Sequence, residues 1–155
     1  MKRTLLPRLV GSLLLGILLL GCFRDVRPYE FRQPVDQIAR IEICRNEYDT
    51  SDRSVPKVLL KTLEPSEHWE LVDAVQDVPG NYLYTNSATG IGLYQIRILY
   101  KDGESEEIGA YSSCYTLADG TWGMDCYMFD VAQFHEMLSS FLGETVTPTD
   151  DAEPG

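Results

Sequence analysis

Basic residues and histidine are scarce in this chain. Its 155 residues include 13 lysines and arginines against 24 aspartates and glutamates, and only two histidines, His68 and His135. A protein that binds nucleic acid needs a basic surface to neutralise phosphate groups. The formal charge of −11 at pH 7 therefore argues against nucleic acid as a partner.

Catalytic and metal-binding motifs are also lacking. The sequence contains no Cys-x-x-Cys or His-x-x-x-His spacing, no Gly-x-Ser-x-Gly elbow and no glycine-rich phosphate loop. His135-Glu136 resembles the start of the His-Glu-x-x-His zinc motif, but Ser139 stands in place of the second histidine. We therefore expect no catalytic residue, no metal and no cofactor, and we interpret both histidines as surface residues of helices. A metal-assisted hydrolase is the least favoured class.

Long apolar runs are absent after residue 20. The one run that exists, 9–20, follows a start that contains Lys2, Arg3 and Arg8, and it ends at Gly21-Cys22. It is shorter than the roughly 20 apolar residues that cross a bilayer. A basic start followed by a short apolar run is typical of a signal peptide, which predicts a signal peptide over residues 1–21.

The end of this run, Leu19-Leu20-Gly21-Cys22, resembles the lipobox of bacterial lipoproteins. In that family the cysteine thiol receives diacylglycerol and the cysteine becomes the new N-terminus after cleavage. The resemblance implies that Cys22 is lipidated and holds the protein on the extracytoplasmic face of the cell membrane. Two or more acyl chains give stable anchoring, at roughly 0.8 kcal/mol per buried CH₂. The alternative is a plain signal peptide followed by an incidental cysteine.

Removal of residues 1–21 takes away three positive charges and no negative ones. The mature chain then has 24 acidic and 10 basic side chains, a formal charge of −14. Such a domain is not attracted to an anionic lipid surface, so we expect it to stand off from the membrane.

The mature chain divides into three parts by composition. Residues 22–34 are predicted to be the lipidated cysteine and a flexible, proline-containing tether, and residues 144–155 a disordered acidic tail. Residues 35–143 form the folded domain. Its periodicity predicts helices that begin at Pro65 and after Asp130, and strands over 38–45, 55–63, 93–101, 106–116 and 122–129. This order predicts an α+β fold with a single antiparallel sheet of about four to six strands and two helices packed on one face.

The parity of the apolar positions predicts how the last three strands pair. Ile98, Ile108 and Met124 are all even-numbered. Residues that pair directly across a hairpin share a face, so the even-numbered residues of both strands lie on one face only if the numbers of paired residues have an even sum. Two-residue Asp-Gly loops at 102–103 and 119–120 would give odd sums. We therefore expect three- or five-residue turns at both places.

The same parity bears on the cysteines. It places Cys114 and Cys126 on one face of adjacent strands, directly opposite or one step diagonal, within the reach of a disulfide. Two buried thiols are the alternative. Cys44 is left over on the polar face of its strand, where we expect an unreactive cysteine.

Tyrosine is abundant, with nine residues. The pattern places Tyr111, Tyr115 and Tyr127 on the outward face of the last strands, beside Gln95 and Arg97. Because tyrosine is favoured at interfaces, this face is the candidate platform for a protein or glycan partner. The alternative is that strand propensity alone explains these tyrosines.

The stretch Gly92–Gly103 and the closing Phe-Asp…Phe…Met-Leu helix resemble small uncharacterised lipoproteins of Gram-positive gut bacteria. The resemblance covers about the second half of the chain and implies no activity and no catalytic residues. We therefore expect a membrane-anchored, non-catalytic binding or interaction module. The alternative is a small extracytoplasmic inhibitor or immunity-type protein whose acidic surface blocks a basic enzyme.

Overall fold

The computed structural model describes residues 27–47, 56–83 and 90–146, so Cys22 and the predicted signal peptide lie outside the described residues. Its elements, in chain order, are η1 (Val35–Gln37), β1 (Ile38–Asn46), β2 (Lys57–Thr62), η2 (Pro65–Glu67), α2 (His68–Asp77), β3 (Gly80–Tyr82), β4 (Tyr94–Tyr100), β5 (Ser105–Gly109), β6 (Ser113–Thr116), β7 (Trp122–Asp125), β8 (Tyr127–Phe129) and α3 (Val131–Leu142). In this part of the chain no helix combines the length and the apolar composition needed to cross a bilayer.

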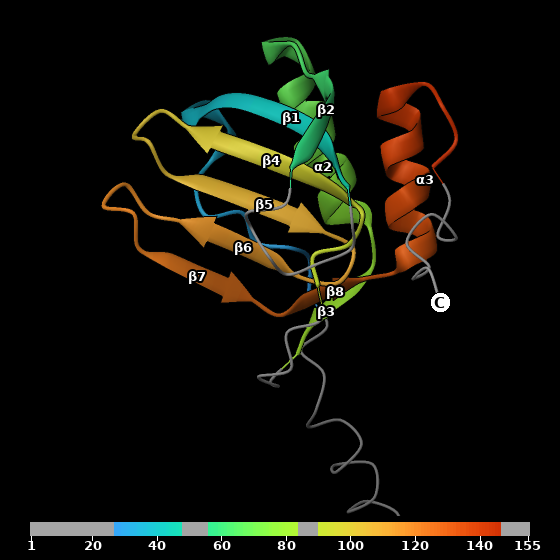
Figure 1. Ribbon diagram of the computed structural model, residues 1–155. Helices are drawn as coiled ribbons and strands as arrows, with labels where there is room; N and C mark the ends of the chain where they lie inside the picture. Colours follow the sequence, from blue (N-terminus) through green and yellow to red (C-terminus); the bar gives the residue numbers. More distant parts are fainter. Residues whose placement is uncertain (1–26, 48–55, 84–89, 147–155) are drawn as a thin grey trace, which may run out of the picture.

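The strands form two antiparallel sheets (Figure 1). Six strands make the larger sheet in the order β2-β1-β4-β5-β6-β7, and β3 pairs with β8 in the smaller one. The α+β class is therefore confirmed, but the prediction of a single sheet is wrong. The predicted strand 122–129 ends at Asp125, and the chain after Cys126 leaves the large sheet to pair with Gly80–Tyr82.

Both predicted hairpin turns are confirmed. In the first hairpin Leu99 pairs with Ser105, and the N–H of Tyr100 donates to the carbonyl of Glu104 at 2.9 Å, which leaves a three-residue turn. In the second, the N–H of Leu117 donates to the carbonyl of Thr121 at 2.8 Å. Each turn ends on a glycine in the left-handed region, Gly103 at φ 92° and Gly120 at φ 86°.

The predicted strand 106–116 is wrong as a single strand, because the chain turns back between Gly109 and Ser112. Ile108 pairs with Ser113, and the sum of these numbers is odd. After the turn the odd-numbered residues, rather than the predicted even-numbered ones, therefore lie on the face of Ile108. Gly109, just before this turn, lies against the chain that precedes β4. A Cβ at that position would lie 1.8 Å from the carbonyl oxygen of Ile91, so only glycine allows the two backbones to approach.

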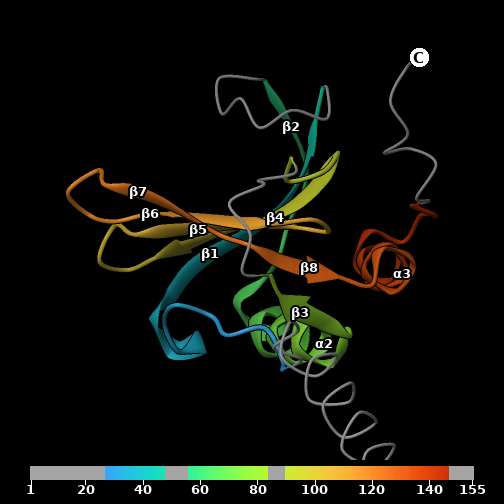
Figure 2. The same cartoon turned by 90° about the horizontal axis from the view of Figure 1, so that it is seen from below.

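The hydrophobic core draws on the sheet, both helices and the segment that precedes β1. Ile41, Ile96 and Ile108 share one core cluster with Leu71 of α2 and Phe134 of α3, and all five are fully buried. The last helix begins after Asp130 as predicted, and the N–H of Gln133 donates to the Asp130 carboxylate at 3.0 Å. At the predicted start Pro65 the chain forms the 3-10 turn η2, with a capping box between Glu64 and Glu67, and α2 follows from His68. Figure 2 shows α2 beside β3, and α3 following β8 at the end of the small sheet.

Two predicted domain limits are too narrow. Tyr29, placed in the flexible tether, is 1% exposed in the core, where its ring packs edge-on against that of Tyr127. Val146, placed in the tail, is buried as well, and its N–H donates to Ser139 Oγ at 2.8 Å. The folded domain therefore extends beyond 35–143 at both ends, to Tyr29 and to Val146.

Candidate functional site

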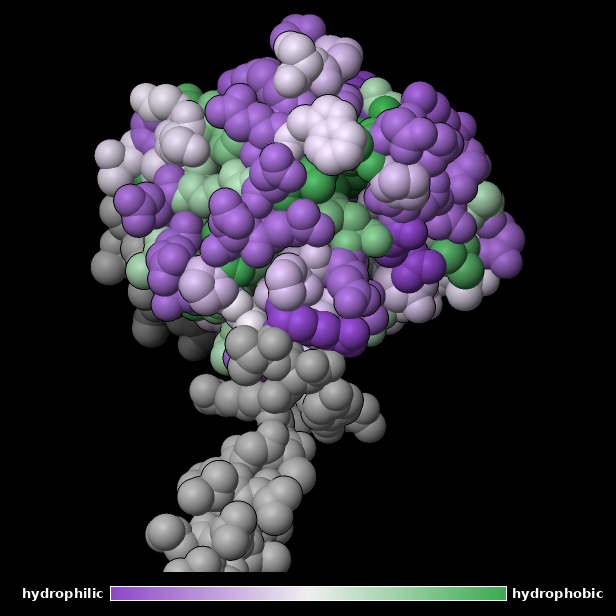
Figure 3. Space-filling view, turned by 180° about the vertical axis from the view of Figure 1, so that it is seen from behind, coloured by the Kyte–Doolittle hydropathy of each residue, from purple (hydrophilic) through white to green (hydrophobic). Residues whose placement is uncertain are grey.

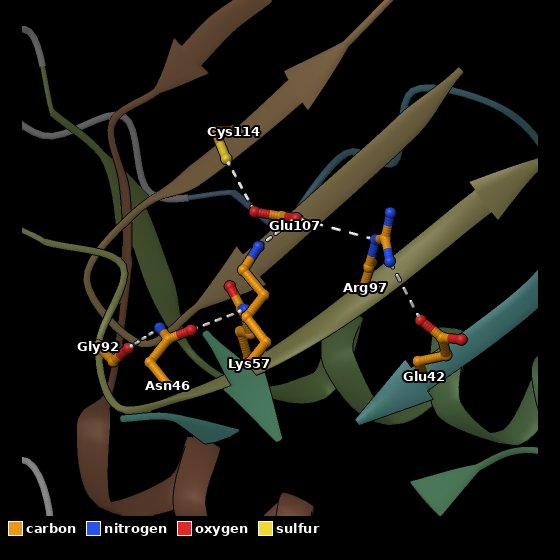
Figure 4. A network of polar contacts seen from close by, with 8 residues as sticks. Glu42, Asn46, Lys57, Gly92, Arg97, Glu107 and Cys114 are labelled. Atoms are coloured by element: carbon orange, nitrogen blue, oxygen red, sulfur yellow. Dashed lines mark hydrogen bonds and ion pairs between the residues drawn. The ribbon is translucent and has the colours of Figure 1, made fainter. Parts of the chain in front are cut away.

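A ladder of polar side chains crosses the face of the large sheet opposite the isoleucine core. Glu42, Arg97, Glu107 and Cys114 are successive partners across β1, β4, β5 and β6. Their side chains follow one another along this line in Figure 4. We call these four residues the polar ladder.

Ion pairs neutralise the two carboxylates of the polar ladder. Glu42 lies 3.5 Å from Arg97 and 3.0 Å from Arg40. Glu107 contacts Lys57 at 2.5 Å and Arg97 at 3.9 Å, and the thiol of Cys114 donates to it at 3.6 Å. Both carboxylates are more than nine-tenths buried, so this pairing offsets the cost of burial. The ladder stabilises the strand register, as opposite charges across strands do.

The amide of Gln95 closes one end of this face. Its Nε2 donates to Asn46 Oδ1 at 3.0 Å, and Asn46 Nδ2 donates to the carbonyl of Gly92 at 2.8 Å (Figure 4). Gln95 is 0% exposed. Its role is therefore to fix the end of β1 against the chain before β4, and a partner cannot reach it.

The predicted tyrosine platform is wrong. Gln95 and Arg97 lie on the polar side of the sheet, whereas Tyr115 pairs with Gly123 on the other side, under the guanidinium of Arg32 at 3.7 Å. Tyr127 is 0% exposed, its hydroxyl donates to the carbonyl of Arg27 at 2.9 Å, and burial raises its pKa to about 12.

Tyr111, the remaining member of that platform, packs half-buried against the core. The turn at 109–112 and the break at Cys126 invalidate the parity on which the prediction depended. The five residues therefore do not make one exposed surface.

The predicted disulfide is also wrong. Cys114 and Cys126 are both thiols. Cys114 pairs with Met124 of β7, and Cys126 follows the end of that strand. Cys44 is 4% exposed on the polar side of the sheet. Burial, together with the nearby charge of Glu42, raises the pKa of its thiol, which keeps it protonated at neutral pH.

A buried carboxylate holds the N-terminal segment against the sheet. Glu106 is 1% exposed and accepts from the hydroxyl groups of Tyr29 at 2.5 Å and Tyr100 at 2.6 Å, one on each oxygen. Burial raises the pKa of Glu106, and these hydrogen bonds partly oppose the rise. The sequence carried a signal for this site, because Glu106 has the even parity of the core residues. We call it the Glu106 latch.

Both histidines are buried, which corrects their interpretation as surface residues. His68 is 5% and His135 1% exposed, and burial lowers the pKa of His68. Within the described ranges no group of three or more His, Cys, Asp or Glu side chains is arranged to hold a metal ion.

The most exposed of the large hydrophobic residues in the described part is Trp69, at 63%. Its helical spacing with Val72 and Val75 predicts a place in the apolar stripe of α2, but the buried residues of the helix are His68, Leu71, Val72 and Val75. Beside Trp69 lies a cleft of about 410 Å³ between α2 and the N-terminal segment. It is lined by Glu30, Phe31, Arg32, Gln33, Pro34, Val35, Trp69, Val72 and Gln76.

A second, shallow groove of about 360 Å³ runs between the two helices. Its lining residues are Ala74, Asp77, Val78, Gln133, Glu136, Met137 and Ser140. Figure 3 shows the back of the molecule, the side on which α2 lies, and hydrophobic surface emerges there between hydrophilic regions. The solvent side of α2 exposes Trp69 together with the acidic side chains Glu70, Asp73 and Asp77.

Comparison with protein-family models, with curated proteins and with solved structures gave no match. The assignment of a function therefore depends on the geometry of this molecule.

Proposed function

We propose that this protein is a lipoprotein, anchored through Cys22 to the extracytoplasmic face of a cell membrane, and that its folded domain is a non-catalytic binding module. The lipobox-like sequence at residues 19–22 supports the anchor. The surface around Trp69 supports the binding role, and it replaces the tyrosine platform.

The exposure of Trp69 is the observation that carries the binding role. An indole is among the largest apolar side chains, and tryptophan is enriched where protein partners are bound most tightly. Here 63% of it faces solvent, next to a cleft whose volume is in the range of ligand sites. A side chain of this kind at this position gains free energy when a partner covers it.

We also infer that both helices cover the same face of the large sheet. The support is the shared core cluster, in which Leu71 and Phe134 join Ile41, Ile96 and Ile108. With its buried stripe turned toward the sheet, α2 presents its opposite side to solvent.

One experiment on the full-length chain with a C-terminal tag tests both parts of the proposal. We expect Cys22→Ser to move the protein from the membrane fraction to the soluble fraction. We expect Trp69→Ala to leave its melting temperature within about 2 °C of wild type, because exposed substitutions change stability by less than about 0.5 kcal/mol. The same variant should fail to retain partners that co-purify from cell envelopes.

Trp122→Ala is the matched control, since this second tryptophan is 45% exposed on the far edge strand β7. It should retain the partners. Equal recovery with Trp69→Ala and wild type would refute the binding role of this surface. A Cys22→Ser variant that stays in the membrane fraction would refute the anchor.

A further inference from the structure

The solvent side of α2 combines one aromatic ring with uncompensated negative charge. Its exposed residues are Trp69, Glu70, Asp73, Gln76 and Asp77, which we call the α2 outer surface. Neither α2 nor α3 contains a lysine or an arginine. In the part of the chain that the structure describes, Glu70, Asp73 and Asp77 form no salt bridge.

This arrangement costs the isolated helix stability. Asp73 and Asp77 are four residues apart and Glu70 and Asp73 three apart, so like charges are neighbours on the same stripe. Asp77 is the last residue of α2 and the last turn holds no basic residue, so a negative charge lies at the negative end of the helix dipole. A positively charged partner relieves both effects.

The basic groups of the neighbouring segments are already engaged. Lys61 pairs with Glu67 at 3.0 Å and donates to the carbonyl of Phe141 at 2.9 Å. The guanidinium of Arg32 lies on the ring of Tyr115. The guanidinium of Arg27 lies 4.5 Å from the ring centre of Tyr82. These three basic groups of the described residues therefore do not neutralise the α2 outer surface.

Trp69 adds a second attraction for a cation. Tryptophan is the best aromatic partner for a lysine or arginine side chain that approaches its ring face. Asp73 lies four residues after Trp69, one turn along the same helix, so a carboxylate adjoins the ring. From Trp69 to Asp77 the surface extends about 12 Å along the axis, which matches several residues of a bound segment.

We propose that the α2 outer surface docks a lysine- and arginine-rich segment of a partner protein. This inference rests on the proposed binding function and names the chemistry of the partner. Its physical basis is charge complementarity around a central aromatic ring. If the protein is an inhibitor or immunity-type protein, the α2 outer surface is the acidic surface that contacts its basic target.

The test uses the full-length chain in detergent with Trp122→Phe, so that Trp69 is the one remaining tryptophan and reports binding by its fluorescence. The probe is a twelve-residue peptide of alternating lysine and alanine, compared with an alternating glutamate and alanine peptide and with a chito-oligosaccharide. We expect saturable quenching by the lysine peptide alone. The triple variant Glu70→Gln, Asp73→Asn, Asp77→Asn should bind it about tenfold more weakly, because each exposed charge pair contributes only a small factor to affinity.

The matched control is Asp36→Asn, Glu47→Gln, Glu144→Gln, which changes the net charge equally at exposed positions outside α2. Its affinity should stay within about threefold of wild type. Equal weakening of both triple variants would overturn the proposal, because attraction would then follow total charge. Binding of the oligosaccharide alone would overturn it too, and would assign the surface to a glycan.

The two proposals fail separately. If Trp69→Ala loses its envelope partners while the Glu70, Asp73 and Asp77 triple variant retains them, the binding module stands and the basic partner is refuted. If Trp69→Ala retains them, the binding role of this surface is itself refuted.

Discussion

At the scale of the residue, the Glu106 latch joins the N-terminal segment to the sheet. The carboxyl group accepts from Tyr29 and Tyr100 inside the core. Burial raises its pKa above the usual 4.5, so the folded protein holds this proton more tightly than the unfolded chain does. Stability from this group is fully present below pH 4.5 and is lost as pH rises through the folded pKa. The latch thus opposes folding more at neutral than at acidic pH.

We expect Glu106→Gln to change the pH dependence of stability. Glutamine has the shape of the neutral acid and does not ionise. The free energy of unfolding of the variant should therefore rise relative to that of wild type as the pH increases from 4 to 7. Urea unfolding at several pH values measures this difference. Glu144→Gln, at an exposed position, should give a nearly constant difference. A constant difference for Glu106→Gln as well would show that the carboxyl group is not desolvated.

The sequence predicted residue roles well where only local patterning was involved. Asp130 caps its helix, and the isoleucines of β1 and β4 face the core, because capping and alternation depend on neighbours in sequence. The predictions for Tyr127 and Trp69 were both wrong. Tyr127 was predicted on the exposed face and is buried, whereas Trp69 was predicted in the core and is exposed. Whether a partner element covers a side chain is set by tertiary packing, which a single sequence does not reveal.

At the scale of the element, the turns decide which side chains of the last strands share a face. Both Asp-Gly turns were predictable from parity, since Ile98 and Ile108 share a face only across a turn of odd length. The turn after Gly109 lacks a comparable signal. The need for glycine at that position comes from the close approach of Ile91, which is 18 residues away in sequence.

We expect Gly109→Ala to lower the free energy of unfolding by about 3 kcal/mol, because the added Cβ would meet the Ile91 carbonyl and the backbones must separate. Chemical denaturation measures the loss. Gly120→Ala is the control, since nothing lies within 4 Å of a Cβ there and its cost is the positive φ, about 1 kcal/mol. Equal costs for the two variants would contradict the close approach at Gly109.

At the scale of the whole molecule, the N-terminal segment belongs to the fold rather than to the tether. Composition placed the boundary at residue 35, because arginine, aspartate and two prolines without a period are typical of a linker. The segment is nevertheless held by side chains at single positions, Tyr29 above all. Isolated anchors of this kind have no periodicity to detect. The α+β class, by contrast, follows from alternation and helix spacing over many residues.

We expect a chain that begins at Val35 to be severely destabilised. It lacks Tyr29, so the core loses a buried aromatic ring at about 3–5 kcal/mol, a large fraction of the stability of a small domain. Of its two tyrosine donors, Glu106 would lose Tyr29 and keep Tyr100. Thermal unfolding followed by circular dichroism compares this chain with one that begins at Arg27, which should unfold cooperatively. Similar melting temperatures would show that the segment is dispensable.

The same packing shortens the connection to the proposed lipid. Only residues 23–26 separate Cys22 from Arg27, and a chain of this length reaches at most roughly 17 Å. A lipid on Cys22 would therefore confine the domain to a thin layer beside the bilayer. A partner in the same membrane would meet it by lateral diffusion, at an effective concentration set by the thickness of that layer. Even weak intrinsic affinity would then be enough for substantial occupancy.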